Sequence, residues 1–66
     1  MRLAGQEIRS KATYAKGRIV KTSQLHIFVS FNKTNEDCIS LTYDQFLDLC
    51  ICSDEVKEEI IQRIKI

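Results

Sequence analysis

The chain has 66 residues, 10 of them Lys or Arg and 9 Asp or Glu, and this length predicts a single domain, residues 1–66, with a small core. No apolar run approaches the roughly 20 residues that a membrane-spanning helix needs, and no secretory signal peptide is recognisable. The three cysteines are odd in number, so we expect no disulfide framework and a cytoplasmic protein, or a nuclear one in a eukaryote.

The charges are divided unequally between the two halves of the chain. Residues 1–33 carry seven basic side chains and one acidic side chain, whereas residues 34–66 carry eight acidic and three basic ones. The formal net charge of +1 therefore conceals a first half at +6 and a second half at −5. This asymmetry indicates an anionic partner for one side of the protein, although a basic face that is merely solvated would give the same pattern.

Four segments in the first 42 residues carry the pattern of β-strands. Residues 6–15 alternate as a half-solvated strand does, and residues 15–17 are predicted to turn because Gly17 can adopt a positive φ. Residues 18–22 and 38–42 are predicted as shorter strands, and residues 32–37 as a polar turn. Residues 25–31 give the strongest strand signal, and if Leu25, Ile27, Val29 and Phe31 face the core then Phe28 faces outward.

At Thr42 the hydrophobic period changes from two to about 3.6. Thr42 and Gln45 fit a capping box at the start of a helix, and Ser53 can cap a second helix after a break at residues 51–53. A single kinked helix over residues 43–65 is the alternative. The predicted buried stripes comprise Tyr43, Phe46, Leu47 and Cys50 in the first part and Val56, Ile60, Ile61 and Ile64 in the second.

Strands followed by helices predict an α+β fold. We expect an antiparallel sheet of three to four strands, followed by one kinked or two short C-terminal helices that cover one face of the sheet. Basic residues then lie on the sheet and acidic residues on the helices, so the open face of the sheet is the predicted anion-binding surface.

The basic strands also carry aromatic residues, a combination typical of proteins that bind single-stranded nucleic acid. Cationic side chains contact phosphates and aromatic rings stack on bases. The predicted nucleic-acid-binding residues are Arg9, Lys11, Lys16, Arg18, Lys21, Tyr14 and Phe28.

Residues that could support catalysis or metal binding form no recognisable constellation. His26 lacks a paired nucleophile or carboxylate, and Cys38, Cys50 and Cys52 do not have the spacing of a zinc motif. The two glycines stand apart, so there is no glycine-rich phosphate loop. We therefore predict a protein that is not an enzyme, with no catalytic residue, metal or cofactor, and with the cysteines as small core residues.

Residues 16–21, 25–32 and 39–49 together resemble the single-stranded DNA-binding domain of the transcriptional coactivator positive-cofactor-four family. The most specific segment runs from Ile39 to Phe46, where an Ile-Ser-Leu-Thr strand leads into a helix that opens Tyr-Asp-Gln-Phe. The resemblance implies four antiparallel strands, a C-terminal helix, a dimer formed through the helices and basic grooves for single-stranded DNA. The chain departs from the family pattern at Cys38, where the family has glycine, and at Phe46, where tryptophan is usual.

Two predictions concern protein partners. The small core and the apolar helical stripe favour a symmetric homodimer with Val56, Ile60, Ile61 and Ile64 at the interface. The alternative function is a small phage or mobile-element protein that docks on a host protein and inhibits it. Its acidic helical face would attract a basic protein surface and comprises Asp44, Asp48, Glu55, Glu58 and Glu59.

Overall fold

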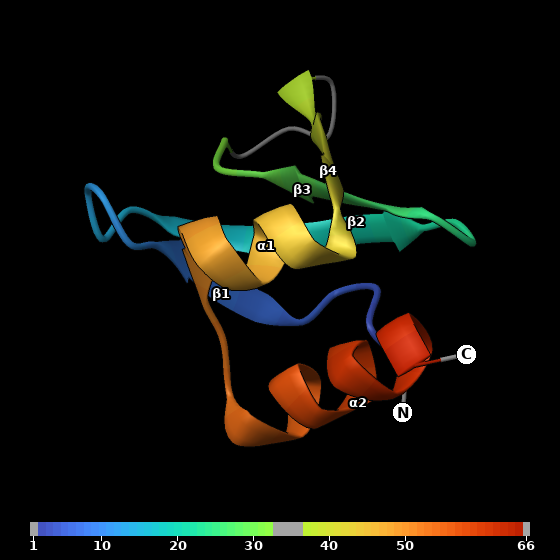
Figure 1. Ribbon diagram of the computed structural model, residues 1–66. Helices are drawn as coiled ribbons and strands as arrows, with labels where there is room; N and C mark the ends of the chain where they lie inside the picture. The colour runs from blue at the N-terminus through green and yellow to red at the C-terminus, as the bar shows by residue number, and fades with distance from the viewer. Residues whose placement is uncertain (1, 33–36, 66) are drawn as a thin grey trace.

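The computed structural model describes residues 2–32 and 37–65. It has an α+β fold in which five strands and two helices follow one another along the chain (Figure 1). The elements in chain order are β1 (Glu7–Ser10), β2 (Lys16–Thr22), β3 (His26–Ser30), β4 (Ile39–Thr42), α1 (Tyr43–Leu49), β5 (Cys50–Ile51) and α2 (Asp54–Lys65).

The five strands form one antiparallel sheet in the order β4-β3-β2-β1-β5. The sheet curls into a half-barrel, and both helices lie on its inner side (Figure 1). The alternation of the strands explains this arrangement, since one face of each strand is apolar and needs cover. The α+β class and the strands-then-helices arrangement are therefore confirmed.

The predicted number of strands was too low. A fifth strand, β5, pairs with β1, with Arg9 opposite Ile51 and Ser10 opposite Cys50. This strand has two residues, and a period of two cannot be recognised in so short a segment. It occupies the break between the two helices, so the chain has two separate helices rather than one kinked helix.

The first predicted strand was too long. Strand β1 ends at Ser10, whose hydroxyl oxygen accepts hydrogen bonds from the backbone N–H groups of Ala12 and Thr13 at 3.2 and 3.4 Å. A serine hydroxyl that binds the following amides favours a turn over a continued strand. Residues 11–15 therefore form the loop between β1 and β2.

The role predicted for Gly17 was also wrong, because this residue lies inside β2 and does not have a positive φ. Its backbone passes close to neighbouring atoms instead. A Cβ atom at this position would lie 2.5 Å from Cδ1 of Phe31 and 2.8 Å from the carbonyl oxygen of Ser30. Gly17 is needed for close packing rather than for a turn.

Both predicted helix starts are confirmed. Thr42 and Gln45 form the capping box. The Gln45 backbone N–H donates to the Thr42 hydroxyl oxygen at 3.2 Å, and the Thr42 backbone N–H donates to the Gln45 side-chain oxygen at 3.0 Å. The Ser53 hydroxyl oxygen accepts from the N–H of Val56 at 3.3 Å at the start of α2. Polar residues thus satisfy backbone donors that a helix start leaves open.

The core lies between the inner face of the sheet and the two helices. Its apolar residues are Leu3, Ile8, Ile19, Ile27, Val29, Tyr43, Phe46, Cys50, Val56 and Ile60. Tyr43 also donates a hydrogen bond from its hydroxyl to the carbonyl oxygen of Ser23 at 2.6 Å, which joins α1 to the turn between β2 and β3. No helix within residues 2–32 and 37–65 is long and apolar enough to cross a membrane.

Candidate functional site

The register of the sheet brings four basic residues to its outer face, opposite the core. Arg9 lies opposite Lys16, and Glu7 lies opposite Arg18. The core residue Ile8 separates Glu7 from Arg9, so both point to the outer face. Their cross-strand partners Lys16 and Arg18 therefore share it.

An irregularity in β2 adds the fourth cation. Ile19 pairs with Val29 and Lys21 pairs with Phe28, so β2 holds one extra residue between these pairs, as in a β-bulge. Without the extra residue, Ile19 and Lys21 would share the inner face. The bulge turns Lys21 outward, beside Arg18, and simple alternation could not have predicted this.

Phe28 lies on the outer face with these cations. The Nζ atom of Lys21 is 4.8 Å from the centroid of the Phe28 ring, which is within the range of a cation–π interaction. The ring is half-buried, whereas the neighbouring Ile27 and Val29 are fully buried on the other face. The predicted outward orientation of Phe28 is confirmed. The core position predicted for Leu25 is wrong, because Leu25 lies in the loop before β3 and is 69% exposed.

Tyr14 lies at one end of this surface, in the loop that joins β1 to β2. Its side chain is 65% exposed, and its carbonyl oxygen accepts a hydrogen bond from the Arg9 guanidinium at 2.9 Å. A guanidinium has five N–H donors, so this bond leaves Arg9 able to contact a phosphate as well. We call Arg9, Lys16, Arg18, Lys21, Phe28 and Tyr14 the outer basic face.

The outer basic face is not uniformly positive. Glu7 is the one acidic residue in the described strands β1–β4, and it lies opposite Arg18. The Arg18 guanidinium also donates to the carbonyl oxygen of Asn32 at 2.9 Å. Four cations against one carboxylate still leave an excess of positive charge. Arg18 is the cation with the most contacts inside the protein, because it lies opposite Glu7 and donates to Asn32.

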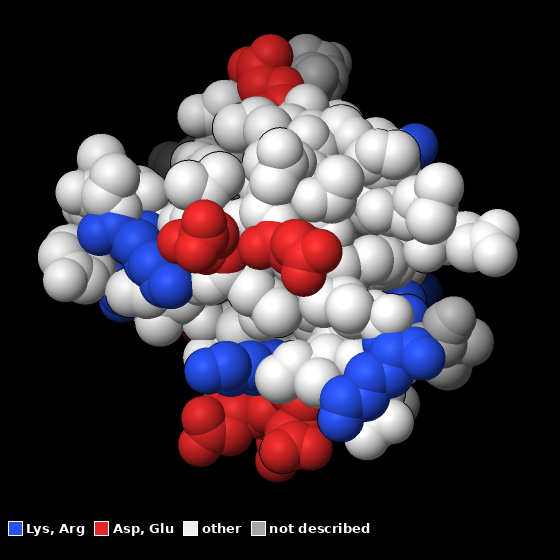
Figure 2. Space-filling model, viewed as in Figure 1, with Lys and Arg blue, Asp and Glu red and all other residues white. Residues whose placement is uncertain are grey.

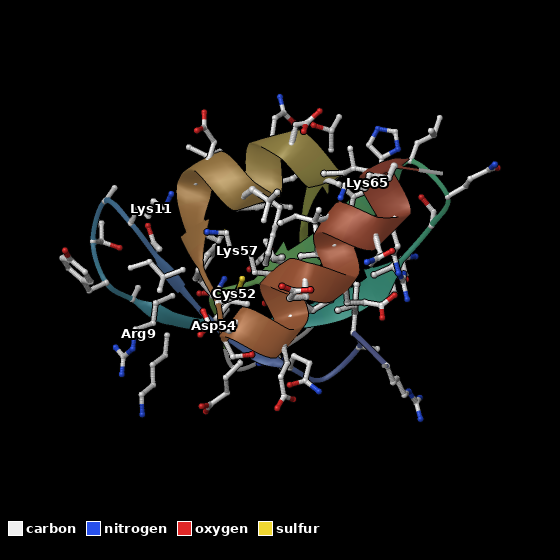
Figure 3. The ribbon with its side chains drawn as sticks, turned by 60° about the horizontal axis from the view of Figure 1, so that its bottom comes forward. Arg9, Lys11, Cys52, Asp54, Lys57 and Lys65 are labelled. Carbon is white, nitrogen blue, oxygen red and sulfur yellow. The ribbon has the colours of Figure 1, made fainter. Side chains whose placement is uncertain are left out.

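Lys11 is the one predicted binding residue that lies elsewhere. Its Nζ atom donates to the carbonyl oxygen of Leu47 at 3.0 Å, at the end of α1. It lines a small cleft together with Cys52, Asp54 and Lys57, and Figure 3 shows this group apart from Arg9. Strict alternation in residues 6–15 had placed Lys11 with Arg9, and the loop that begins at residue 11 removes it from that face.

The helical side of the molecule carries two separate acidic groups. Figure 2 shows one of them across the middle of this side and one at its lower end, with basic side chains between and beside them, and a further acidic patch at the top of the view. The acidic residues in the helices are Asp44 and Asp48 in α1, and Asp54, Glu55, Glu58 and Glu59 in α2. Glu59 is engaged with Arg63, 3.1 Å away, so the acidic face predicted for protein docking is interrupted.

Sequence reasoning missed an apolar pocket of about 440 Å³ between the sheet and the end of α1. Ile39 and Leu49 border it and are 49% and 54% exposed. Ile39 begins β4 and shares a face with Leu41, as the alternation predicts, and Leu49 ends α1, but the rest of the core does not cover either side chain. The pocket faces away from the outer basic face, because its lining includes the inward residue Val29.

Two of the three cysteines have the character of core residues, since Cys50 is buried and Cys52 is half-buried, but Cys38 is exposed and its predicted place in the core is wrong. Burial raises the pKa of the Cys50 thiol, and burial raises the pKa of Cys52 more than the nearby Lys57 lowers it. Both thiols are therefore protonated and weakly nucleophilic near neutral pH. In the part of the chain that the structure describes, no three His, Cys, Asp or Glu side chains are grouped in a way that could hold a metal ion.

The residues predicted for a dimer interface divide into two pairs. Val56 and Ile60 are fully buried within a single chain. Ile61 is half-buried and Ile64 is 41% exposed, so these two are accessible to a second chain, at the C-terminal end of α2.

No protein-family model matches this chain, and neither a curated protein nor a solved structure matches it. The resemblance to the positive-cofactor-four family therefore stays a prediction, and any functional assignment depends on the geometry of the outer basic face.

Proposed function

We propose that the outer basic face binds single-stranded nucleic acid and that the protein is not an enzyme. The observation that carries this proposal is the shared face of four cations and an aromatic ring, set by the pairing of β1, β2 and β3. Cations in register along a sheet can follow a phosphate backbone, while exposed rings accept bases.

The contact between Lys21 and Phe28 is compatible with base stacking. An exposed cation–π interaction contributes about 0.5–1 kcal/mol, whereas stacking of a base on an aromatic side chain contributes about 1–3 kcal/mol. A base can therefore displace the Lys21 ammonium group from the ring with a net gain in free energy. The released ammonium group then remains close enough to contact a neighbouring phosphate.

The salt dependence of binding tests this proposal. Affinity for a short labelled oligonucleotide that cannot form base pairs should fall with salt, with a log–log slope of roughly −0.7 for each phosphate contact. Four cations predict a slope near −2.8 on that scale. DNA and RNA oligonucleotides of the same sequence should be compared, because phosphate contacts and base stacking are available to both.

Matched variants separate the cations from the ring. Lys16→Ala and Lys21→Ala should each weaken binding and lower the slope by roughly 0.7, whatever the base sequence. Lys11→Ala is the control, since Lys11 is bound to the end of α1 and should leave the slope unchanged. Phe28→Ala should weaken binding about 5- to 150-fold with a nearly unchanged slope.

Absence of any binding at low salt would overturn the proposal. The rival is then the protein-docking function, with Asp48 and the apolar pocket beside it as the contact surface. A host protein bound through that pocket would lose affinity on Leu49→Ser, a change that leaves the outer basic face intact.

We further propose that the protein forms a symmetric homodimer in the cytoplasm, or in the nucleus of a eukaryote. Ile61 and Ile64 are the predicted interface residues that remain accessible in one chain. Light scattering should report two chains at micromolar concentration, and a mass of 7.7 kDa at every concentration would contradict the dimer. Ile64→Ser should shift the mass toward the monomer without unfolding the chain.

A further inference from the structure

Tyr14 has an unusual backbone conformation. Its φ is 60°, and it is the one residue other than glycine with a positive φ in residues 2–32 and 37–65. The left-handed region is unfavourable for L residues, least so for Gly, Asn and Asp, and a bulky aromatic residue there is a genuine outlier. The position resembles the end of a helical turn, where Gly or Asn is usual.

The surrounding loop holds Tyr14 in this conformation through several hydrogen bonds. The Tyr14 N–H donates to the Ser10 carbonyl oxygen at 2.8 Å, and the Ser10 N–H donates to the Ala15 carbonyl oxygen at 3.1 Å. Arg9 donates to the Tyr14 carbonyl oxygen, and the Lys11 N–H donates to the Leu49 carbonyl oxygen at 3.0 Å. Hydrogen bonds therefore fix the conformation of the loop and connect it to β1 and α1.

Folding does not explain the tyrosine side chain at this position. The backbone would suit Asn or Gly better, and a side chain that is 65% exposed adds little to the core. Strained residues held in place by their surroundings cluster at functional sites. Tyr14 also lies in the loop that joins β1 to β2, and its carbonyl oxygen accepts a hydrogen bond from Arg9, one of the four cations.

We propose that Tyr14 is a preformed stacking platform that makes the outer basic face select unpaired bases over duplex. This inference rests on the proposed function and adds the source of its specificity. Cations contact the phosphates of single and double strands alike, so they cannot distinguish the two. A ring held in solvent can stack only on a base that is free of its own stack, because duplex bases are already covered.

The test compares Tyr14→Asn with Tyr14→Phe. Asn fits the left-handed region, so Tyr14→Asn should raise the melting temperature by roughly 4–8 °C while it lowers single-strand affinity about 5- to 150-fold. Duplex affinity and the salt slope should stay nearly unchanged, so the preference for single strands is lost. Tyr14→Phe keeps the ring and should keep both the affinity and the preference.

Leu25→Asn is the matched control. Leu25 is also a large apolar residue in a loop, 69% exposed, and it does not have a positive φ. The same change there should raise neither the melting temperature nor the affinity for duplex, and should leave single-strand binding unchanged.

The possible failures can be told apart. If wild type binds no oligonucleotide, the proposed function fails and the inference fails with it. If wild type binds single strands and Tyr14→Asn binds them equally well, or loses single and double strands in the same proportion, the inference is overturned and the proposed function stands. A lower melting temperature for Tyr14→Asn would show that the ring serves the fold, which also overturns the inference.

Discussion

The two faces of the sheet use the same strands for different purposes. On the inner face Ile8, Ile19, Ile27 and Val29 are at most 2% exposed and pack with residues of both helices. On the outer face Arg9, Lys16 and Lys21 are exposed, and Phe28 is half-buried beneath Lys21. The inner face therefore carries the stability of this small domain, while the outer face can change without loss of the fold.

The largest expected effect is on the inner face. Phe46 is fully buried in α1, and replacing a core phenylalanine by alanine costs about 3–5 kcal/mol. This approaches the whole stability of a small domain, about 5 kcal/mol at the lower end. Phe46→Ala should therefore be only marginally stable, with an unfolding midpoint at far lower urea than wild type when followed by circular dichroism.

Phe28→Ala provides the contrast, because it removes a ring of the same size from the outer face. It should stay folded and lose oligonucleotide affinity instead. Equal losses of stability in Phe46→Ala and Phe28→Ala would break the distinction between the two faces.

A smaller effect is expected at Gly17, which allows Phe31 to pack against β2. An added Cβ atom would lie 2.5 Å from the Phe31 ring and 2.8 Å from a backbone oxygen, distances that require the neighbours to move. Overpacking of this kind costs typically about 1–3 kcal/mol, so Gly17→Ala should lower the free energy of unfolding by that amount.

The Phe31→Leu variant sharpens this measurement. In the Gly17→Ala background it should recover part of the lost stability, because the smaller side chain can move away from the new methyl group. The contact with the Ser30 backbone oxygen remains, so recovery should be incomplete. Gly17→Ala that is as stable as wild type would contradict the close packing.

Much of the inner face could be predicted from the sequence, because its signals are periodic. Alternation identified Ile27 and Val29, and the change of period at Thr42 identified the capping box. The short strand β5 could not be found in this way, since its pairing with β1 is a long-range contact between Arg9 and Ile51. Tertiary contacts decide such short strands, and local patterns do not record them.

The outer face was harder to predict, for two physical reasons. The bulge in β2 appears only in the pairing of β2 with β3, and it is this bulge that places Lys21 on the outer face. The hydrogen bonds of Ser10 ended β1 early, which separated Lys11 from Arg9. The turn predicted at residues 32–37 falls mostly on residues 33–36, outside the described residues.

The smallest expected effect concerns the half-buried ion pair of α2. Arg63 donates from Nε to Glu59 at 3.1 Å, and this hydrogen bond lowers the pKa of Glu59 below its ordinary value. A carboxyl group whose pKa is lower in the folded state stabilises the fold above its unfolded pKa. That contribution is lost as the pH falls through the folded pKa.

Because the pair lies at the surface and is partly solvated, Glu59→Gln should destabilise the protein only slightly at neutral pH. The difference from wild type should shrink below about pH 4, where an ordinary glutamate becomes protonated. Urea titrations of both proteins at several pH values measure this difference. In an Arg63→Gln background the pH dependence of the Glu59→Gln change should be reduced, since the largest of the interactions that lower the pKa is gone. A pH-dependent difference that is just as large without Arg63 would show that Arg63 is not the main cause of the lowered pKa.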